Sequence, residues 1–563
     1  MPEPGKPSPS ESLKEKSNYL RDALKEALSQ DTTHFTNDQN YLLKFHGVYQ
    51  QDDRDKRQEL LAQKKEAAFS MMVRSKIPGG RMSAEQYLVH DKLADQYGNK
   101  TLRITNRQGI QFHGVLKKNM KAVIRAINEK LGTTSGACGD IVRNVLACPA
   151  PHADRQKIEI QRYAKEISDQ FLAKSGAYYE IWLNGEPLKA AAPASADPEP
   201  IFGKTYLPRK FKIAIAFPDD NCIDVLTDDI GIVPEIKDGK LTGFNIFVGG
   251  GFGTTHGVAT TYPRLGSAFC FVQPADIKEI CKAIVLVQRD NGNRSDRKRA
   301  RLKYLLDERG LDWFRAEVEK RYGKKTEPVH EVKWKAIETH LGWQPMTGGK
   351  WYFGLSIENG RIKDEGDMRL KTALRTAVEK YRPEVYLTAQ QDVLLAGFAE
   401  EQKKELEEHF TRHGVKLPSQ LSNIQKDAMA CPALPTCGLA ITESERVMPS
   451  VVDEVEKQAA QLGLAGQRIM LRMTGCPNGC ARPYNAEIAF VGRTVGTYAI
   501  YLGGNLQGNR LNFLYKDKVP YPEVAGAVGT ILKLYVKTRL PDEGVGDFCS
   551  RLGAEGLQKA LAV

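Results

Sequence analysis

The sequence lacks any apolar run that approaches the ~18 residues needed to cross a membrane. Its first residues, MPEPGKPSPSES, have neither the basic start nor the apolar core of a secretory or import signal. The 41% hydrophobic and 27% charged residues are typical of a soluble globular protein. These absences predict a cytoplasmic protein without a membrane partner.

Signatures of nucleic-acid binding are also missing, although the net charge is +12. Neither an RNP-type aromatic strand nor a zinc-finger spacing accompanies this charge. The pattern instead favours an anionic cofactor, an anionic substrate and an acidic protein partner, and it predicts no nucleic-acid partner. The basic residues stand in short motifs near Gly-rich turns: Arg103 and Arg107, Arg143, and Arg209 with Lys210 and Lys212.

A dinucleotide fingerprint is absent as well. Gly249, Gly250 and Gly251 open the string GGGFGTT, which lacks the G-x-G-x-x-G spacing, so the sequence predicts no nicotinamide site. The three glycines either end a strand or let backbone amides approach an anionic cofactor.

Four of the ten cysteines form two close pairs near the C-terminal end. Cys431 and Cys437 have C-x5-C spacing, and Cys476 and Cys480 have C-x3-C spacing. Four thiolates are the usual ligands of an iron–sulfur cluster. Structural zinc fits the C-x5-C spacing less well, and buried inert thiols are the third possibility. Disulfides are disfavoured because the other six cysteines are scattered singly.

The chain repeats itself. ITNRQGIQFHG (104–114) parallels LTAQQDVLLAG (387–397), and ACPAP (147–151) parallels ACPAL (430–434), both 283 positions apart. Cys148 thus stands at the place of Cys431, although its own role is not evident. KIAIAF (212–217) further resembles NAEIAF (485–490), and FVGGG (247–251) resembles YLGGN (501–505). This unit is too long for a solenoid and indicates two halves related by a pseudo-twofold axis.

Strand and helix patterns are mixed within each half. KTLRITNRQGIQFHGV predicts one strand, and AQQDVLLAGFAEEQKKELEEHF has helical spacing. We expect an α+β fold with mixed and largely antiparallel sheets around a central cofactor site. The predicted domains are an N-terminal arm (1–65), a ferredoxin-like half-repeat (66–150), an anion-binding domain (151–335), a second half-repeat (336–425) and a cluster domain (426–563).

Eight strings resemble the siroheme-dependent sulfite and nitrite reductases, and the similarity extends over nearly the whole chain from about residue 15. The N-terminal wording LLKFHGVYQQDDRD is most similar to the ferredoxin-dependent, plant-type sulfite reductases. The strings are MMVRSKIPGG (71–80), LRITNRQGIQFHGV (102–115), GACGDIVRNVLA (136–147), YLPRKFK (206–212), GFNIFVGGG (243–251), QRDNGNRSDRK (288–298), MACPALPTC (429–437) and TGCPNGCARP (474–483).

The resemblance implies siroheme and a 4Fe–4S cluster as cofactors. It places the cluster on Cys431, Cys437, Cys476 and Cys480, with Cys480 also the axial ligand of the siroheme iron. Asn478 and Gly479 can supply the positive backbone dihedrals that aim both sulfurs of the C-x3-C turn.

The resemblance also implies the residues around substrate and siroheme. Arg74, Arg143, Lys210 and Lys212 match the substrate-contacting set, which neutralises sulfite and relays protons. Four of the implied siroheme contacts share one face of the strand predicted for KTLRITNRQGIQFHGV, because they occupy alternating positions. These four are Arg103, Thr105, Arg107 and Gln111. The siroheme contacts are Arg103, Thr105, Arg107, Gln111, Arg209, Gly249, Gly250, Gly251, Arg301, Gln391, Asn478 and Cys480.

Three functions remain open on the sequence alone. The first is assimilatory sulfite reductase, the second is nitrite reductase on the same scaffold, and the third is a non-enzymatic iron–sulfur or zinc protein. For the first, we expect a monomer that receives electrons from an acidic ferredoxin. A separate flavoprotein subunit is the alternative donor.

Overall fold

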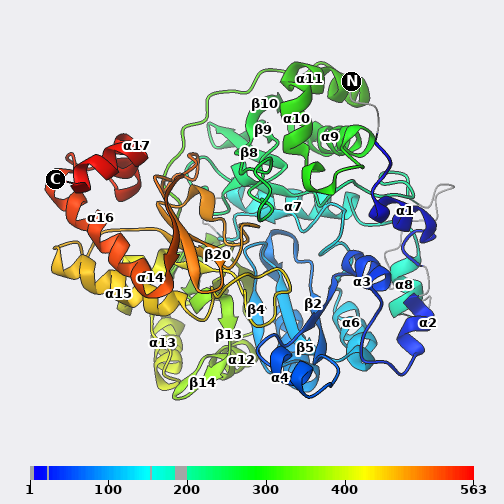
Figure 1. Cartoon of the computed structure of the whole chain (residues 1–563), viewed down its shortest axis with the longest axis horizontal. Coiled ribbons are helices and arrows are strands. Elements are labelled where there is room, and N and C mark those ends of the chain that lie inside the picture. Colours follow the sequence, from blue (N-terminus) through cyan, green and yellow to red (C-terminus); the bar gives the residue numbers. More distant parts are fainter. Residues whose placement is uncertain (1–4, 22–23, 152–154, 184–198, 563) are drawn as a thin grey trace.

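The computed structural model describes residues 5–21, 24–151, 155–183 and 199–562 (Figure 1). Within these residues, four five-stranded sheets and their covering helices form an α+β fold with two related halves, as predicted. None of the described helices is both long and apolar enough to cross a bilayer.

Two of the sheets are antiparallel and exchange a strand with each other. Their orders are β1-β2-β5-β4-β13 and β11-β12-β17-β16-β3. Strand β3 leaves the first half to pair with β16, and β13 leaves the second half to pair with β4. This exchange fastens the two halves together. The strands are β1 (Val48–Asp52), β2 (Phe69–Arg74), β3 (Arg81–Met82), β4 (Leu102–Ile104), β5 (Ile110–Val115), β11 (Gly342–Pro345), β12 (Trp351–Leu355), β13 (Arg361–Ile362), β16 (Glu384–Leu387) and β17 (Val393–Phe398).

Equivalent helices accompany these two sheets. Helices α5 (Ala84–Tyr97) and α6 (Met120–Glu129) belong to the first, and α12 (Leu370–Tyr381) and α13 (Lys403–Arg412) belong to the second. Helix α5 begins at a capping box between Ser83 and Gln86. It meets α12 of the other half, where Lys371 Nζ lies 3.0 Å from the buried carboxylate of Asp91.

The other two sheets also share one topology. Their orders are β6-β7-β8-β9-β10 and β18-β19-β20-β21-β22. In each, the first three strands are parallel and the last two are antiparallel additions. The strands are β6 (Leu146–Ala147), β7 (Ile213–Ile215), β8 (Ile230–Lys237), β9 (Lys240–Val248), β10 (Ser267–Val272), β18 (Met429–Ala430), β19 (Leu471–Thr474), β20 (Ile488–Thr494), β21 (Thr497–Leu502) and β22 (Phe513–Pro520).

The remaining helices belong either to the N-terminal arm or to the segments that connect and follow the sheets. Figure 1 shows the arm helices α1 and α2 on the opposite side of the molecule from the C-terminal helices α16 and α17. The arm is held to the body, since the buried Lys14 ammonium donates to Leu207 O at 2.8 Å. These helices are α1 (Pro9–Lys16), α2 (Leu24–Ser29), α3 (Asn37–Leu43), α4 (Arg57–Ala62), α7 (Arg155–Gln170), α8 (Ala177–Trp182), α9 (Ile277–Asn291), α10 (Leu302–Arg309), α11 (Leu311–Tyr322), α14 (Asn423–Asp427), α15 (Met448–Gln461), α16 (Val524–Thr538) and α17 (Val545–Ala562); β14 (Asp364–Glu365) and β15 (Met368–Arg369) form a small hairpin.

Strand register corrects one of the internal matches. Leu146 pairs with Ala214, and its counterpart Met429 pairs with Arg472, so Ala214 corresponds to Arg472, 258 positions later. KIAIAF therefore forms β7, the counterpart of β19, whereas NAEIAF leads into β20. The predicted match was wrong because β7 and β20, which are not equivalent strands of the two sheets, are both buried and apolar. FVGGG and YLGGN do occupy equivalent places, at the ends of β9 and β21.

Two secondary-structure predictions also need correction. The stretch predicted as one strand is a hairpin, because residues 105–109 turn between β4 and β5. The stretch read as helical from Ala389 onward first forms β17, and α13 begins only at Lys403. In both cases a turn interrupts a pattern that looked continuous in sequence.

A buried ion pair joins the two halves at equivalent positions. By the 258-residue offset Asp224 corresponds to Arg482, and both have left-handed backbone conformations, with φ of 52° and 53°. Asp224 Oδ2 lies 3.0 Å from Arg482 Nη1 and 2.9 Å from Arg472 Nη1. All three side chains are at most 6% exposed. The contact therefore depends on charge balance within a nearly dry interface.

We predict that Asp224→Asn lowers the free energy of unfolding by about 3–5 kcal/mol, because two buried guanidinium groups lose their counter-ion. Thermal and denaturant unfolding followed by circular dichroism measure this loss. The control Asp453→Asn, on the exposed side of α15, should change stability by less than about 0.5 kcal/mol. Equal effects of the two substitutions would contradict the interpretation.

Candidate functional site

The four paired cysteines follow two neighbouring parallel strands. Cys431 comes directly after β18, and Cys476 and Cys480 come after β19. The carboxyl ends of parallel neighbours meet at one sheet edge, so the sequence brings these thiols together. Gly475 N donates to Cys431 Sγ at 3.4 Å. A Cβ on Gly475 would lie 2.4 Å from Thr442 O, so this close turn requires glycine.

The chemistry of this thiol set fits an iron–sulfur cluster. Burial raises the pKa of Cys431 to about 12, and the neighbouring Cys480 and Cys437 thiols raise it too. Burial likewise raises the pKa of Cys437, with a further contribution from Cys480. Four thiolates can coexist here only around a strongly cationic centre, which iron supplies. Of the two turn residues, only Gly479 has a positive φ (67°); Asn478 does not, contrary to expectation.

Arg74 and Gln111 meet on neighbouring strands. Arg74 ends β2 and pairs with Gln111 of β5. With its amide oxygen facing Arg74, Gln111 accepts from Arg74 Nε at 3.1 Å and from Nη2. Arg74 Nη1 also donates to Cys138 Sγ at 3.2 Å. These contacts fix the guanidinium in place.

The β4–β5 hairpin keeps Arg103 and Gln111 side by side, as cross-strand partners. Arg103 Nη2 donates to Ala430 O at 2.8 Å, and its Nε lies 3.2 Å from Glu445 Oε2. Gln391 Nε2 donates to the same Ala430 oxygen at 3.2 Å. Both side chains therefore support the backbone that precedes Cys431. Their predicted siroheme contact stays a prediction.

Thr105 and Arg107 shape the turn of the hairpin. Thr105 Oγ1 accepts from Gly109 N at 3.2 Å, which closes the turn. Arg107 Nη1 donates to Asp228 Oδ1 at 2.8 Å, and its Nη2 donates to Asn144 O at 2.6 Å. Arg143, the residue before Asn144, is buried and donates from Nε to Gly139 O at 2.7 Å.

Three buried carboxylates that sequence reasoning missed balance the basic set. Asp140 lies 3.8 Å from Arg209, and Asp228 lies 3.7 Å from Lys212. Asp229 pairs with Arg301 at 2.8 Å. The string TDDIG was visible in the sequence, but its basic partners lie up to 121 positions away. Arg301 is thus an ion-paired residue, and its contact with a siroheme carboxylate stays a prediction.

Two basic side chains, Arg301 and Lys303, donate hydrogen bonds to the backbone oxygens of the triple glycine. Lys303, another residue that the sequence did not single out, donates to Gly251 O at 3.0 Å. Arg301 Nη2 donates to Gly250 O at 3.3 Å. A Cβ on Gly250 would lie 2.2 Å from Leu226 O, so no side chain fits there.

Two half-buried lysines, Lys210 and Lys212, have lowered pKa values. Burial lowers the pKa of Lys210 well below its usual range, and nearby Lys212 and Arg209 lower it further. Cys480 acts on the pKa of Lys210 in the opposite direction. Burial lowers the pKa of Lys212 to about 8, and Asp228 limits the drop. Amines with such pKa values can exchange protons near neutral pH.

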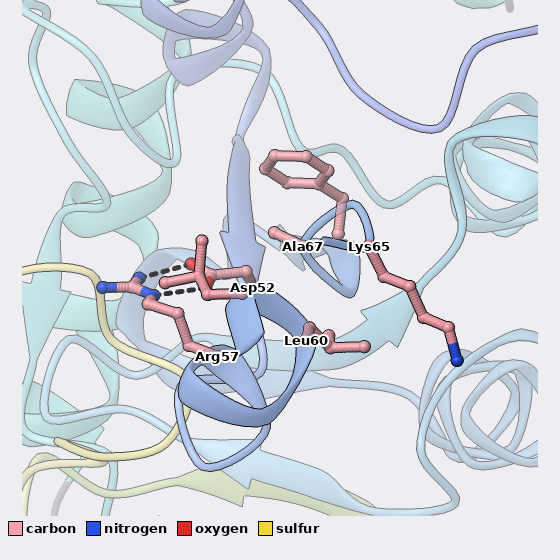
Figure 2. Close-up of a pocket in the computed structure, with 7 residues that line it drawn as sticks. Asp52, Arg57, Leu60, Lys65 and Ala67 are labelled. Atoms are coloured by element: carbon pink, nitrogen blue, oxygen red, sulfur yellow. Dashed lines mark hydrogen bonds and ion pairs between the residues drawn. The ribbon is translucent and has the colours of Figure 1, made fainter. Parts of the chain in front are cut away.

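A separate surface pocket lies beside α4 and the β1–β2 hairpin (Figure 2). An Asp52–Arg57 ion pair of 2.7 Å forms one wall, and Leu60 and Phe69 contribute apolar surface. Its lining includes none of the predicted site residues. The predicted site residues lie instead on the β4–β5 hairpin, in the basic segments and at the cysteine edge.

Three segments match family models. Residues 62–130 and 344–413 match the model described as nitrite/sulfite reductase ferredoxin-like half domain. Residues 138–326 match the nitrite and sulphite reductase 4Fe-4S domain. The two half-domain matches coincide with the two strand-exchanged sheets.

Curated proteins match over the full length. The protein named sulfite reductase [NADPH] hemoprotein beta-component of Anoxybacillus flavithermus is 44% identical over 550 residues, covering 98% of this chain and 96% of that protein. The protein named sulfite reductase [ferredoxin] of Synechococcus elongatus is 43% identical over 572 residues, covering 99% and 91%. The solved structure of the Mycobacterium tuberculosis NirA protein has a TM-score of 0.79 at 22% identity and covers 98% of both chains, which shows a shared fold.

Proposed function

From the membership of this chain in the siroheme- and 4Fe–4S-dependent sulfite and nitrite reductase family, we propose that it reduces sulfite to sulfide in sulfur assimilation. The observation that carries the proposal is the group of buried and half-buried arginines and lysines that accompanies the β4–β5 hairpin and the cysteine edge. A small dianion requires this density of positive charge. Nitrite reduction to ammonia on the same scaffold is the alternative reaction.

The cofactors would be held by residues from both halves. Cys431, Cys437, Cys476 and Cys480 would bind the cluster, and Cys480 would also ligate the siroheme iron. When bound, siroheme and the cluster would pass on the six electrons that the donor supplies, and siroheme would provide the iron for sulfite. The siroheme carboxylates would be received by the basic residues and backbone amides predicted above. Asn106, which donates to Cys480 O, orients the ligand loop from the hairpin.

The protein side chains then have separate tasks. Arg74 and Arg143 are fixed by neighbouring backbone or side-chain acceptors, so they can neutralise substrate charge without reorganising. Lys210 and Lys212 hold the protons that departing oxygens need. Because burial brings the pKa of Lys212 to about 8, it can release a proton and recover it between turnovers.

The first prediction concerns Cys480. The wild-type protein should contain about five iron atoms per chain, four in the cluster and one in siroheme. Cys480→Ser should lose the electronic coupling between the two centres and retain little siroheme, seen as weakened visible absorption. Cys549→Ser, a buried cysteine of α17, is the matched control and should keep both. About one iron per chain in the wild type would contradict the cofactor assignment.

The second prediction concerns Lys212 and sulfite. A second ammonium favours a dianion over a monoanion, by an amount on the order of 1 kcal/mol or more in a partly desolvated site. Lys212→Asn should lower kcat/KM for sulfite about tenfold or more and lower it less for nitrite. Lys204→Asn, an exposed lysine of the same loop, should change neither. A higher wild-type kcat/KM for nitrite than for sulfite would favour the alternative reaction.

The electron donor is proposed to be a small acidic ferredoxin. The +12 net charge and the missing dinucleotide fingerprint support it. The cluster edge also lies near the surface: Arg54 donates to Cys437 O at 3.1 Å, and Leu439 is 68% exposed. A flavoprotein subunit is the second candidate, because the Anoxybacillus protein is named as an NADPH-type hemoprotein component.

The third prediction separates these donors. Ferredoxin-dependent turnover should fall as salt rises, since charges are screened over about 8 Å at physiological ionic strength, whereas turnover with a small dye should fall much less. Leu439→Glu should impair ferredoxin-dependent turnover and spare the dye reaction. Leu131→Glu, another exposed leucine, is the control. Activity with an NADPH-driven flavoprotein, and none with reduced ferredoxin at low salt, would reverse the assignment.

A further inference from the structure

A second group of metal-ligating side chains lies outside the site described above. Cys148, Asp220, Cys222 and His340 place one ligand atom each within 4.8 Å of the others. All four residues are buried, with at most 6% exposure. None of them belongs to the four cluster cysteines, and the reaction proposed above uses none of them.

Three distances within this group are close to those between neighbouring ligands of a tetrahedral ion. Cys148 Sγ lies 3.1 Å from Asp220 Oδ2 and 3.7 Å from His340 Nε2. His340 Nε2 lies 3.0 Å from Asp220 Oδ2. Four ligands at zinc distances of about 2.0–2.3 Å are separated from one another by about 3.3–3.8 Å. A small movement of the side chains would therefore complete the geometry.

The surrounding hydrogen bonds orient the ligands toward one point. Asp220 Oδ1 accepts from Cys222 N at 3.2 Å and from Glu338 N at 3.1 Å, which leaves Oδ2 directed into the group. Gln161 holds Cys148 O at 2.7 Å, and Gln390 donates to Cys222 O. Oriented ligands of this kind are a usual feature of metal sites.

The duplication explains why the cysteines are there. Cys148 corresponds to Cys431 at the 283-residue offset. The register of β7 and β19 makes Cys222 the counterpart of Cys480 at the 258-residue offset. The first half thus keeps cysteines at two of the four positions that the second half uses for its cluster. Pro218 and Asp220 replace Cys476 and Asn478.

The fourth ligand comes from the connection between the halves. Residues 323–341 link α11 to β11, and His340 lies at the end of this linker with a left-handed φ of 59°. A Cβ at Gly354 would lie 1.9 Å from His340 O, so the strand beside it has room only for glycine. Lys335 N also donates to Pro218 O at 2.9 Å. The group thus fastens the linker to the first half.

We propose that Cys148, Cys222, His340 and Asp220 bind one Zn²⁺ in a closed, structural site at the pseudo-symmetric counterpart of the iron–sulfur cluster. Two thiolates, one imidazole and one carboxylate oxygen suit a borderline-soft ion with four ligands. On binding, both thiols and a protonated His340 release their protons to solvent, and no electron is transferred. Buried on all sides, the ion would leave no position open for a substrate.

Metal content and X-ray absorption test this proposal on the tag-free holoprotein, produced in zinc-supplemented medium. Mass spectrometry of the metals should give about one zinc per chain in addition to iron. The zinc absorption edge should show about two sulfur neighbours near 2.3 Å and two nitrogen or oxygen neighbours near 2.0–2.1 Å. This spectrum comes from the wild type and does not depend on any variant folding.

Variants separate this site from the iron–sulfur cluster. Cys222→Ser and His340→Ala should lower zinc about tenfold while iron is retained. Cys431→Ser should lose iron and keep zinc. Cys281→Ser, a buried cysteine of α9, should keep both metals. Wild-type protein without zinc, a Cys148–Cys222 disulfide in the intact mass, or zinc that persists in Cys222→Ser with unchanged sulfur neighbours would each overturn the proposal.

Discussion

The contact on which the two halves depend is the buried pairing of Asp224 with Arg472 and Arg482. One carboxylate faces two guanidinium groups, and all three side chains are at most 6% exposed. Burial lowers the pKa of Arg482 to about 10, and Asp224 limits the drop. Charges in such surroundings are stable only when they are matched, so the contact fixes one relative placement of the halves. The two equivalent loops that flank it are thereby fixed as well.

Those loops run over residues 217–230 and 475–488 and have the same length, yet their chemistry differs. The second contains Cys476 and Cys480, which are proposed to hold the cluster. In the first, Pro218 and Asp220 stand at the places of Cys476 and Asn478, and Asp228 and Asp229 turn toward cations. One backbone frame therefore presents a cysteine pair in one half and carboxylates paired with basic side chains in the other. The strand exchange of β3 and β13 holds both frames against the hairpin that carries Arg103 and Arg107.

Much of this architecture was predictable from the sequence, since the duplication, the α+β class and the cysteine pairs can all be read from it. The β4–β5 hairpin was missed because the strand pattern of the sequence continues without a break on either side of Asn106. The 258-residue offset between the loops 217–230 and 475–488 was missed because β7 and β20 are equally apolar. The carboxylates Asp140, Asp228 and Asp229 were missed because a buried charge pair is formed by residues distant in sequence, which no local pattern reports.

These carboxylates decide how the basic site can work. If every arginine and lysine were fully matched, the site would have no net attraction for an anion; if none were, the buried charges would be unstable. The structure lies between these limits. Arg107 and Arg301 have close carboxylate partners at 2.8 Å, whereas Lys212 lies 3.7 Å from Asp228. The paired arginines thus form a fixed frame, whereas Lys212, with its pKa lowered to about 8, is able to part with a proton near neutral pH.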